Sequence, residues 1–241
     1  MTGRAGQGPA AGVDGCRAGW FYVALDERGV FRHGLVGRFE EVVDALRHAG
    51  LVLVDIPIGL PGAGRPARDC DVAARRAISP RGSTIFPAPS RAALDAPDYA
   101  GACAANRSET GRGISRQCWN IVPKIHEVDR FLQRADGHPP IREMHPEVAF
   151  WALNGGVPLM TKKKSRDGLE ERLAVLGRYW PEVRAGFAAR SAVASVSALT
   201  PAGVSERSLG SDIDAYSVRL AGGGRPACDP PLNHVAADDL S

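Results

Sequence analysis

The sequence lacks the features that mark secreted, membrane and zinc-binding proteins. Its five cysteines are odd in number and widely spaced and form no CxxC pair, which argues against a disulfide framework or a zinc knuckle. No apolar run approaches the roughly 18 residues that a membrane span needs. Residues 1–11 also lack the apolar region of a secretory signal. We therefore expect a cytoplasmic protein with reduced thiols and no membrane partner.

Lysine is scarce as well. Only four of the 30 basic residues are lysines, at Lys124 and in the run 162–164. The net charge of +3 is too small to announce a nucleic-acid binder by itself. The hydrophobic fraction of 44% is typical of globular proteins, and 241 residues can bury one substantial core. We predict one domain over residues 11–224, a flexible segment over 1–10 and a tail over 225–241.

Three short apolar segments separated by turn residues predict an antiparallel meander near the N-terminus. They cover residues 11–14, 20–25 and 30–36. Apolar residues at helical spacing predict an amphipathic helix over 39–49, ended by a glycine. The continuously apolar segment 51–54 has the pattern of a strand buried on both faces. The helix before it makes this strand parallel to the first one and places the two side by side.

The rest of the chain is predicted to add an insertion and further helices. Residues 57–138 are rich in proline and glycine, and we interpret them as an insertion over the sheet edge. The fold class predicted is α/β, with a three-strand antiparallel meander plus parallel strands, flanked by helices. Further helices are predicted over 68–77, 99–110, 125–135, from about 147, over 168–179 and over 212–220, and a short strand over 141–144.

Two carboxylates are predicted to lie at the carboxyl ends of adjacent parallel strands, where open α/β sheets keep their sites. These are Asp14 and Asp55. Such a pair would repel unless a divalent cation neutralised it, and Mg²⁺ or Mn²⁺ is the usual solution. Two such ions about 4 Å apart activate water and stabilise the leaving oxygen in phosphodiester hydrolysis. Taken singly, Asp14 fits a turn before glycine and Asp55 a polar strand end.

Later segments contain carboxylates that are candidates to complete this cluster. Glu143 and Glu147 surround a short strand and a helix start, and Asp212 and Asp214 open the last predicted helix. Either pair is a candidate, and Glu147 and Asp212 are the predicted additional metal ligands. Glu147 also fits a carboxylate that complements a helix dipole, and Asp212 an ordinary N-cap. His145, between the two glutamates, is a candidate general acid or base, or else a structural histidine.

Basic residues supply candidates for substrate binding. Arginine forks hold phosphate oxygens through two hydrogen bonds, and the predicted insertion contains Arg68 and Arg75. Lys124 lies near two acidic residues and would meet either a phosphate or a buried carboxylate. Arg17 lies in the turn that follows Asp14. An ordinary solvated surface is the alternative for most of these positions.

Six ordered segments carry a resemblance to a known family: Gly12–Trp20, Val54–Leu60, Arg68–Asp71, Ile85–Pro89, Lys124–Asp129 and Glu143–Glu147. Together they resemble a bacterial and archaeal family described as predicted RNase H-like nucleases. The resemblance covers about residues 11–180 and implies an RNase H-like fold with Asp14, Asp55, Glu143 and Glu147 in the presumed active site. In that family the last helix opens with a run like Asp-Asp-x-Leu-Asp-Ala, and residues 211–216 are a shortened version of it.

Three functions follow from these residues. The first is a metal-dependent nuclease or phosphodiesterase that acts on a nucleic acid or another phosphoester. The second is a nucleotide-handling or small-phosphoester enzyme of actin-like type, because the hairpin over residues 14–19 resembles a phosphate-cradling turn. The length of the chain argues against this second function, since such ATPases generally close two domains on the nucleotide. The third is a catalytically silent binding module, favoured by the irregular last helix.

Overall fold

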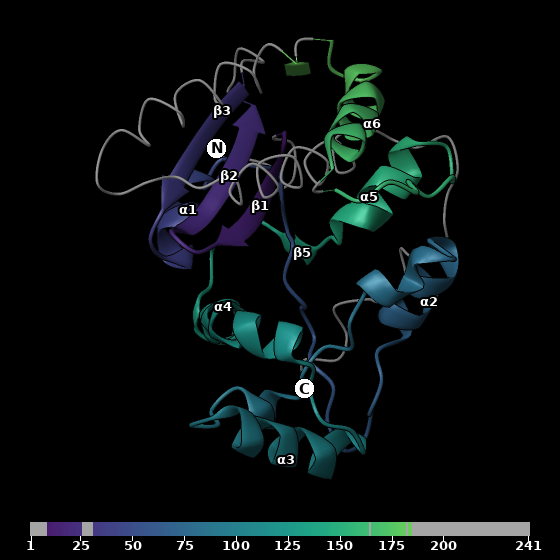
Figure 1. Cartoon of the computed structure of the whole chain (residues 1–241). Coiled ribbons are helices and arrows are strands. Elements are labelled where there is room, and N and C mark those ends of the chain that lie inside the picture. Colours follow the sequence, from purple (N-terminus) through teal and green to yellow (C-terminus); the bar gives the residue numbers. More distant parts are fainter. Residues whose placement is uncertain (1–8, 26–30, 164, 182, 185–241) are drawn as a thin grey trace, which may run out of the picture.

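The computed structural model of the chain describes residues 9–25, 31–163, 165–181 and 183–184, and its centre is one five-stranded sheet (Figure 1). The strand order is β3-β2-β1-β4-β5. Strands β1 to β3 form an antiparallel meander, and β4 and β5 add to it in parallel. The α/β fold class predicted from the sequence is therefore confirmed, and the arrangement is consistent with an RNase H-like fold. The strands are β1 Ala10–Cys16, β2 Gly19–Leu25, β3 Phe31–Val36, β4 Leu51–Val54 and β5 Ile141–Glu143.

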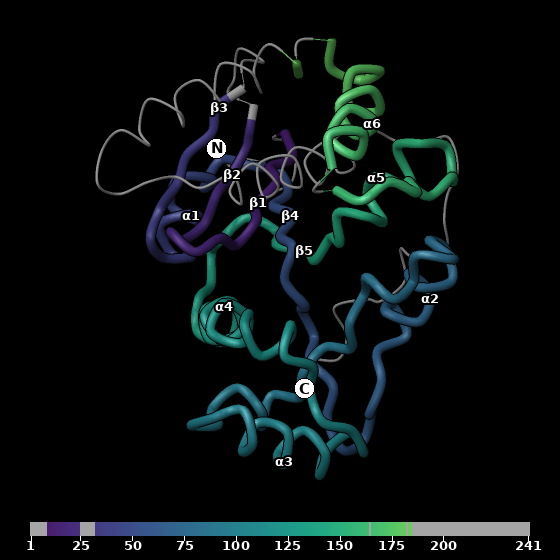
Figure 2. Tube along the Cα trace, viewed as in Figure 1, coloured from purple at the N-terminus to yellow at the C-terminus, as the bar shows by residue number. Residues whose placement is uncertain are grey.

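Helices cover both faces of this sheet. In Figure 1, α5 and α6 lie together on one side of the sheet, while α3 lies below α4 and farther from the strands. The tube in Figure 2 shows the chain leaving the sheet after β4 and running down to the level of α3 and α4. The helices are α1 Phe39–Ala45, α2 Asp69–Ala77, α3 Tyr99–Thr110, α4 Arg116–Arg134, α5 Pro146–Leu153 and α6 Arg166–Gly177, with short 3-10 turns η1 Arg81–Thr84 and η2 Arg91–Ala93.

Side chains alternate between the two faces of each strand, so the sheet builds two apolar cores. One core joins Val13 and Val54 to α1 and α4, for example through Phe39 and Val122. The other joins Phe21 of β2 to α5 and α6. The faces therefore differ in their neighbours, and a residue's place in the strand alternation decides which helices it meets.

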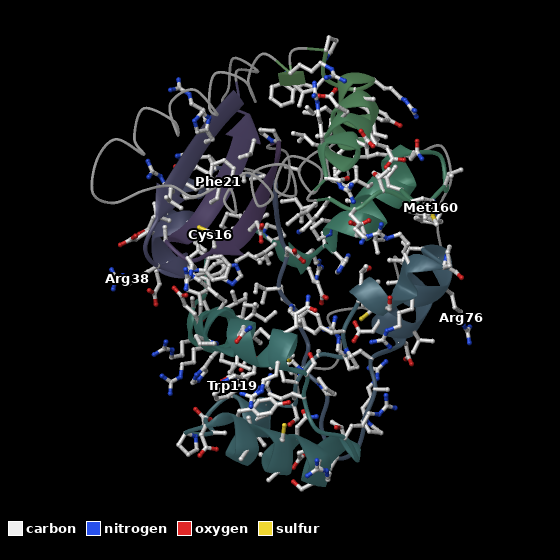
Figure 3. All side chains as sticks on the ribbon, in the orientation of Figure 1. Cys16, Phe21, Arg38, Arg76, Trp119 and Met160 are labelled. Carbon is white, nitrogen blue, oxygen red and sulfur yellow. The ribbon has the colours of Figure 1, made fainter. Side chains whose placement is uncertain are left out.

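Most predicted elements match the structure closely, and α4 differs most. Its start was expected at Ile125, but the helix begins at Arg116 and continues through Pro123. The hydroxyl of Ser115 caps it by accepting a 3.0 Å hydrogen bond from the Cys118 amide. In the first turn of α4, Trp119, labelled in Figure 3, packs against Tyr99 of the preceding helix α3 with ring centroids 6.2 Å apart. The predicted insertion thus contributes α4 to the main core.

Some predicted boundaries shift and others fall beyond the described residues. The first helix ends at Ala45 rather than at residue 49, and β1 begins at Ala10. The predicted last helix over 212–220 and the tail over 225–241 lie outside the described residues. None of the helices in the described ranges combines the length and the apolarity needed to cross a membrane.

Candidate functional site

The register between β1 and β4 places Asp14 beside Asp55. Val13 and Val54 are Cα partners in the parallel pair, and the Asp55 amide extends the ladder with a 3.0 Å hydrogen bond to the Val13 carbonyl. The next residue on each strand is an aspartate. Asp14 is buried and Asp55 is half-buried. The topology predicted from the sequence therefore brings these two carboxylate-bearing positions together at neighbouring strand ends.

Strand alternation assigns Asp14 to the face of the sheet that α5 and α6 cover. Its partner on β2 is Phe21, whose ring belongs to the core formed with these helices. Figure 3 labels Phe21 on β2 and Cys16 at the end of β1. Directly paired residues of neighbouring strands share a face. Asp14 therefore lies on the face of the sheet that α5 covers.

Glu143, at the end of β5, is held by an arginine and a main-chain amide. Its carboxylate accepts a hydrogen bond from Arg68, and a second, 2.9 Å long, from the Ile58 amide in the segment that follows β4. Arg68 also forms a 3.6 Å ion pair with Asp71. Burial raises the pKa of Glu143, and the Arg68 charge opposes this rise. Glu143 is thus tied to α2 and to the loop after Asp55.

The neighbouring carboxylates also change the pKa of Arg68. Burial alone would lower the pKa of Arg68, but Glu143 and Asp71 raise it above its ordinary value. The Arg68 side chain is only 7% exposed, so this charge is kept in the interior by its partners. Asp71 was part of a recognised sequence segment but was not predicted as a site residue.

Glu147 lies in the first turn of α5, among basic groups. Its carboxylate accepts a 2.7 Å hydrogen bond from Arg172 of α6 and lies 3.9 Å from Arg81 of η1. Its amide donates to Nδ1 of His145, which thereby caps the helix. Burial lowers the pKa of His145 to about 4, although the Glu147 charge works against this. At neutral pH His145 is therefore an uncharged imidazole.

Lys124 lies against the end of β1 on the other face of the sheet. Its Nζ is 4.3 Å from the centre of the Trp20 ring and 3.8 Å from Glu127. Its aliphatic stem packs on Gly15, where an added Cβ would lie 3.6 Å from the lysine Cδ. Burial lowers the pKa of Lys124, and Glu127 opposes the shift. The lysine is thus fixed next to the residue that follows Asp14.

Glu127 holds this arrangement together, and its role was not predicted from the sequence. One carboxylate oxygen accepts a 2.9 Å hydrogen bond from the Trp20 indole, and the other accepts a 2.5 Å hydrogen bond from the Phe39 amide. The only available signal was its place three residues after Lys124 on a helix. Arg172 and Arg81 gave no comparable signal, because they lie far along the chain from Glu147.

The remaining predicted site residues are dispersed. Arg75 donates a 2.9 Å hydrogen bond from Nε to the Ile85 carbonyl. Arg17 is exposed in the turn between β1 and β2. Asp212 and Asp214 lie outside the described residues. In the described part of the chain, no group of three or more His, Cys, Asp or Glu side chains is placed to hold a metal ion.

The chain matches one known family. Residues 12–212 match the family described as "Protein of unknown function (DUF429)". Because the match spans most of the chain, this protein belongs to that family. No curated protein and no solved structure matches the chain.

Proposed function

We propose that this protein is a metal-dependent phosphodiesterase or nuclease of RNase H-like type. The observation that carries the proposal is the β1–β4 register, which sets Asp14 beside Asp55 at the carboxyl ends of two parallel strands. Ligand sites of open α/β sheets lie at this position. The mixed sheet order is consistent with such a fold.

The donor set of this pair suits Mg²⁺ or Mn²⁺. Mg²⁺ keeps several waters and binds proteins through one or two carboxylates plus substrate phosphates. Asp14 and Asp55 would supply these two carboxylates, with Asp212 as the predicted third from outside the described residues. Glu143 and Glu147 each have an arginine partner, and their roles as ligands stay predictions. When bound, the ion supplies positive charge for the attacking water and for the phosphate oxygens.

The residues of the chain would then orient the phosphoester at this edge. Lys124 is fixed against Gly15, the residue after Asp14, on the other face of the sheet, so its ammonium would contact a phosphate oxygen that extends past the end of β1. His145 is neutral at pH 7 and is held at the start of α5, which covers the same face as Asp14. An uncharged imidazole is able to accept a proton. These groups provide orientation and proton exchange beside the carboxylate pair.

The test compares isosteric asparagine variants. With Mn²⁺ or Mg²⁺ present, the full chain is expected to hydrolyse bis(p-nitrophenyl) phosphate or one of a set of labelled DNA and RNA strands. Asp14→Asn and Asp55→Asn should each abolish this hydrolysis and weaken Mn²⁺ binding in calorimetry, while circular dichroism stays unchanged. Asp69→Asn is the matched control, because Asp69 is 81% exposed on α2, where it forms an ion pair with Arg65.

Two results would overturn the proposal. Hydrolysis that persists in both asparagine variants would remove Asp14 and Asp55 from the active site. Failure of the unmodified chain to bind Mn²⁺ at all would favour a binding module without catalytic activity.

A further inference from the structure

Two arginines of the α2 segment, Arg68 and Arg75, point their side chains toward the interior of the protein. Arg68 is the N-cap residue of α2 and forms an ion pair with Asp71, and Arg75 lies one turn after Asp71 on the same face of the helix. Arg68 reaches Glu143 at the end of β5, and Arg75 reaches the Ile85 carbonyl just after η1. The next residue, Arg76, is exposed, and Figure 3 shows it pointing outward from the helix.

Each of these arginines keeps one buried nitrogen without a hydrogen-bond partner in the described part of the chain. The atoms are Nη1 of Arg68 and Nη2 of Arg75. Both guanidinium groups are already fixed through another nitrogen, so their planes are oriented before any ligand arrives. Buried donors in native proteins are nearly always paired, with protein, water or a bound ion. Two unpaired donors on one helix face therefore point to a ligand with several acceptor atoms.

The unpaired atoms belong to guanidinium groups, so an anion with several acceptor oxygens suits them best. Arg68 already faces two carboxylates, Glu143 and Asp71. Arg75 is fixed by the Ile85 carbonyl, which is a neutral acceptor, so its positive charge still attracts an anion. Burial in a medium of low polarity strengthens this attraction.

We propose that Arg68 and Arg75 together bind a phosphate group of the substrate, a role that rests on the proposed phosphodiesterase function. Glu143, which fixes Arg68, pairs with Val54 in the β4–β5 ladder, and Asp55 follows Val54 directly. The carboxylate that fixes Arg68 therefore comes from the end of β5, one strand away from the end of β4 that Asp55 follows, and neighbouring strands lie about 4.8 Å apart. It would hold a phosphate next to the one that is cleaved. Arginine suits this task, because its planar fork binds phosphate oxygens in pairs.

The experiment measures phosphate binding apart from hydrolysis. Calorimetry with the full chain in EDTA, so that no metal contributes, uses inorganic phosphate as the probe. The unmodified chain is expected to bind it, and Arg75→Gln should weaken binding by a factor of ten or more. Arg76→Gln is the matched control, since it removes the same charge from the outer side of the same helix, and it should bind as the unmodified chain does.

Arg68 needs a gentler change, because its removal would leave Glu143 and Asp71 without their partner. Arg68→Lys keeps the charge but not the fork, and it should weaken phosphate binding while the unfolding midpoint in urea shows that the chain is folded. A terminally phosphorylated dinucleotide is the second probe. If it binds more tightly than inorganic phosphate, the subsite serves a nucleic-acid strand, and equal affinities assign it to small phosphoesters.

Two outcomes would overturn the subsite. One is no detectable phosphate binding by the unmodified chain, which would mean that water completes the buried donors. The other is equal weakening by Arg75→Gln and Arg76→Gln, which would reduce the effect to net charge. Asp14→Asn separates the two proposals, because it should abolish hydrolysis and leave phosphate binding in EDTA intact. Hydrolysis by both Asp14→Asn and Asp55→Asn would refute the proposed active site and would leave the phosphate-binding result unaffected.

Discussion

Arg172 of α6 has no exposed surface, and its guanidinium donates a 2.7 Å hydrogen bond to Glu147 in the first turn of α5. A second nitrogen of the same group donates to the Gly168 carbonyl at 3.1 Å. The pair links the two helices that cover the Asp14 face of the sheet. A buried charge of this kind depends on its partner, because the interior offers no water to replace it.

Removing the carboxylate should therefore destabilise the fold strongly. We expect Glu147→Ala to lower the free energy of unfolding by about 3 to 5 kcal/mol, since Arg172 would stay buried without its counter-charge. Glu170→Ala is the matched control, because Glu170 pairs with Arg184 at 2.6 Å with both side chains about half exposed. Exposed pairs contribute roughly 0 to 1 kcal/mol. Urea unfolding followed by circular dichroism measures both, and equal effects would contradict the prediction.

Glu127 should be a second point of high sensitivity. Truncation in Glu127→Ala leaves the Trp20 indole and the Phe39 amide without their acceptor, and each unsatisfied donor costs about 1 to 3 kcal/mol. Glu127→Gln keeps one acceptor oxygen and should cost clearly less. The free energies of unfolding in urea give the comparison. Glu109→Ala serves as the control, because Glu109 accepts from the Ala63 amide at an exposed position.

The parallel carboxylate pair was predictable from the sequence because it follows from local patterns. The apolar run over 51–54 ends in Asp55, and a helix before it forces the parallel arrangement with the strand that carries Asp14. No contact between individual side chains had to be guessed. General rules of sheet topology were enough to bring the two positions together.

The partners of the other carboxylates were not predictable in this way. The indole of Trp20 meets Glu127 across 107 positions of sequence, and Arg68 meets Glu143 across 75. Patterns of apolar residues place a helix but do not say which charge will face it from so far away. The predicted start of α4 was wrong for a local reason. Proline usually indicates a helix boundary, but Pro123 lies inside this helix.

The thiol of Cys118 should be inert in the folded protein. It is completely buried in α4, and burial raises its pKa to about 12. Because only the thiolate reacts, alkylation with iodoacetamide at pH 8 should modify Cys118 far more slowly than the half-buried Cys16. Peptide mapping by mass spectrometry gives the rate at each site. Comparable alkylation rates at Cys118 and Cys16 in the folded chain would contradict the burial of Cys118. Comparable rates in urea are expected, because the unfolded chain exposes both thiols.

His145 should make the stability of the chain depend on pH. Burial lowers its pKa to about 4 in the folded state, with Lys163 acting in the same direction and Glu147 against it. In the unfolded chain the imidazole has its ordinary pKa of about 6.5. Below pH 6.5 His145 therefore binds a proton in the unfolded chain but not yet in the folded one. The contribution of His145 is thus complete above pH 6.5 and is lost as the pH falls toward 4.

The variant His145→Asn isolates this contribution, because asparagine keeps an N-cap acceptor for the Glu147 amide but does not titrate. Between pH 7.5 and pH 4.5 the unmodified chain should lose about 2 kcal/mol more unfolding free energy than the variant does. Urea unfolding at intervals of half a pH unit measures it. Both chains share every other titrating group, so a difference that stays constant over this range would mean that His145 is protonated in the folded state as readily as in the unfolded one.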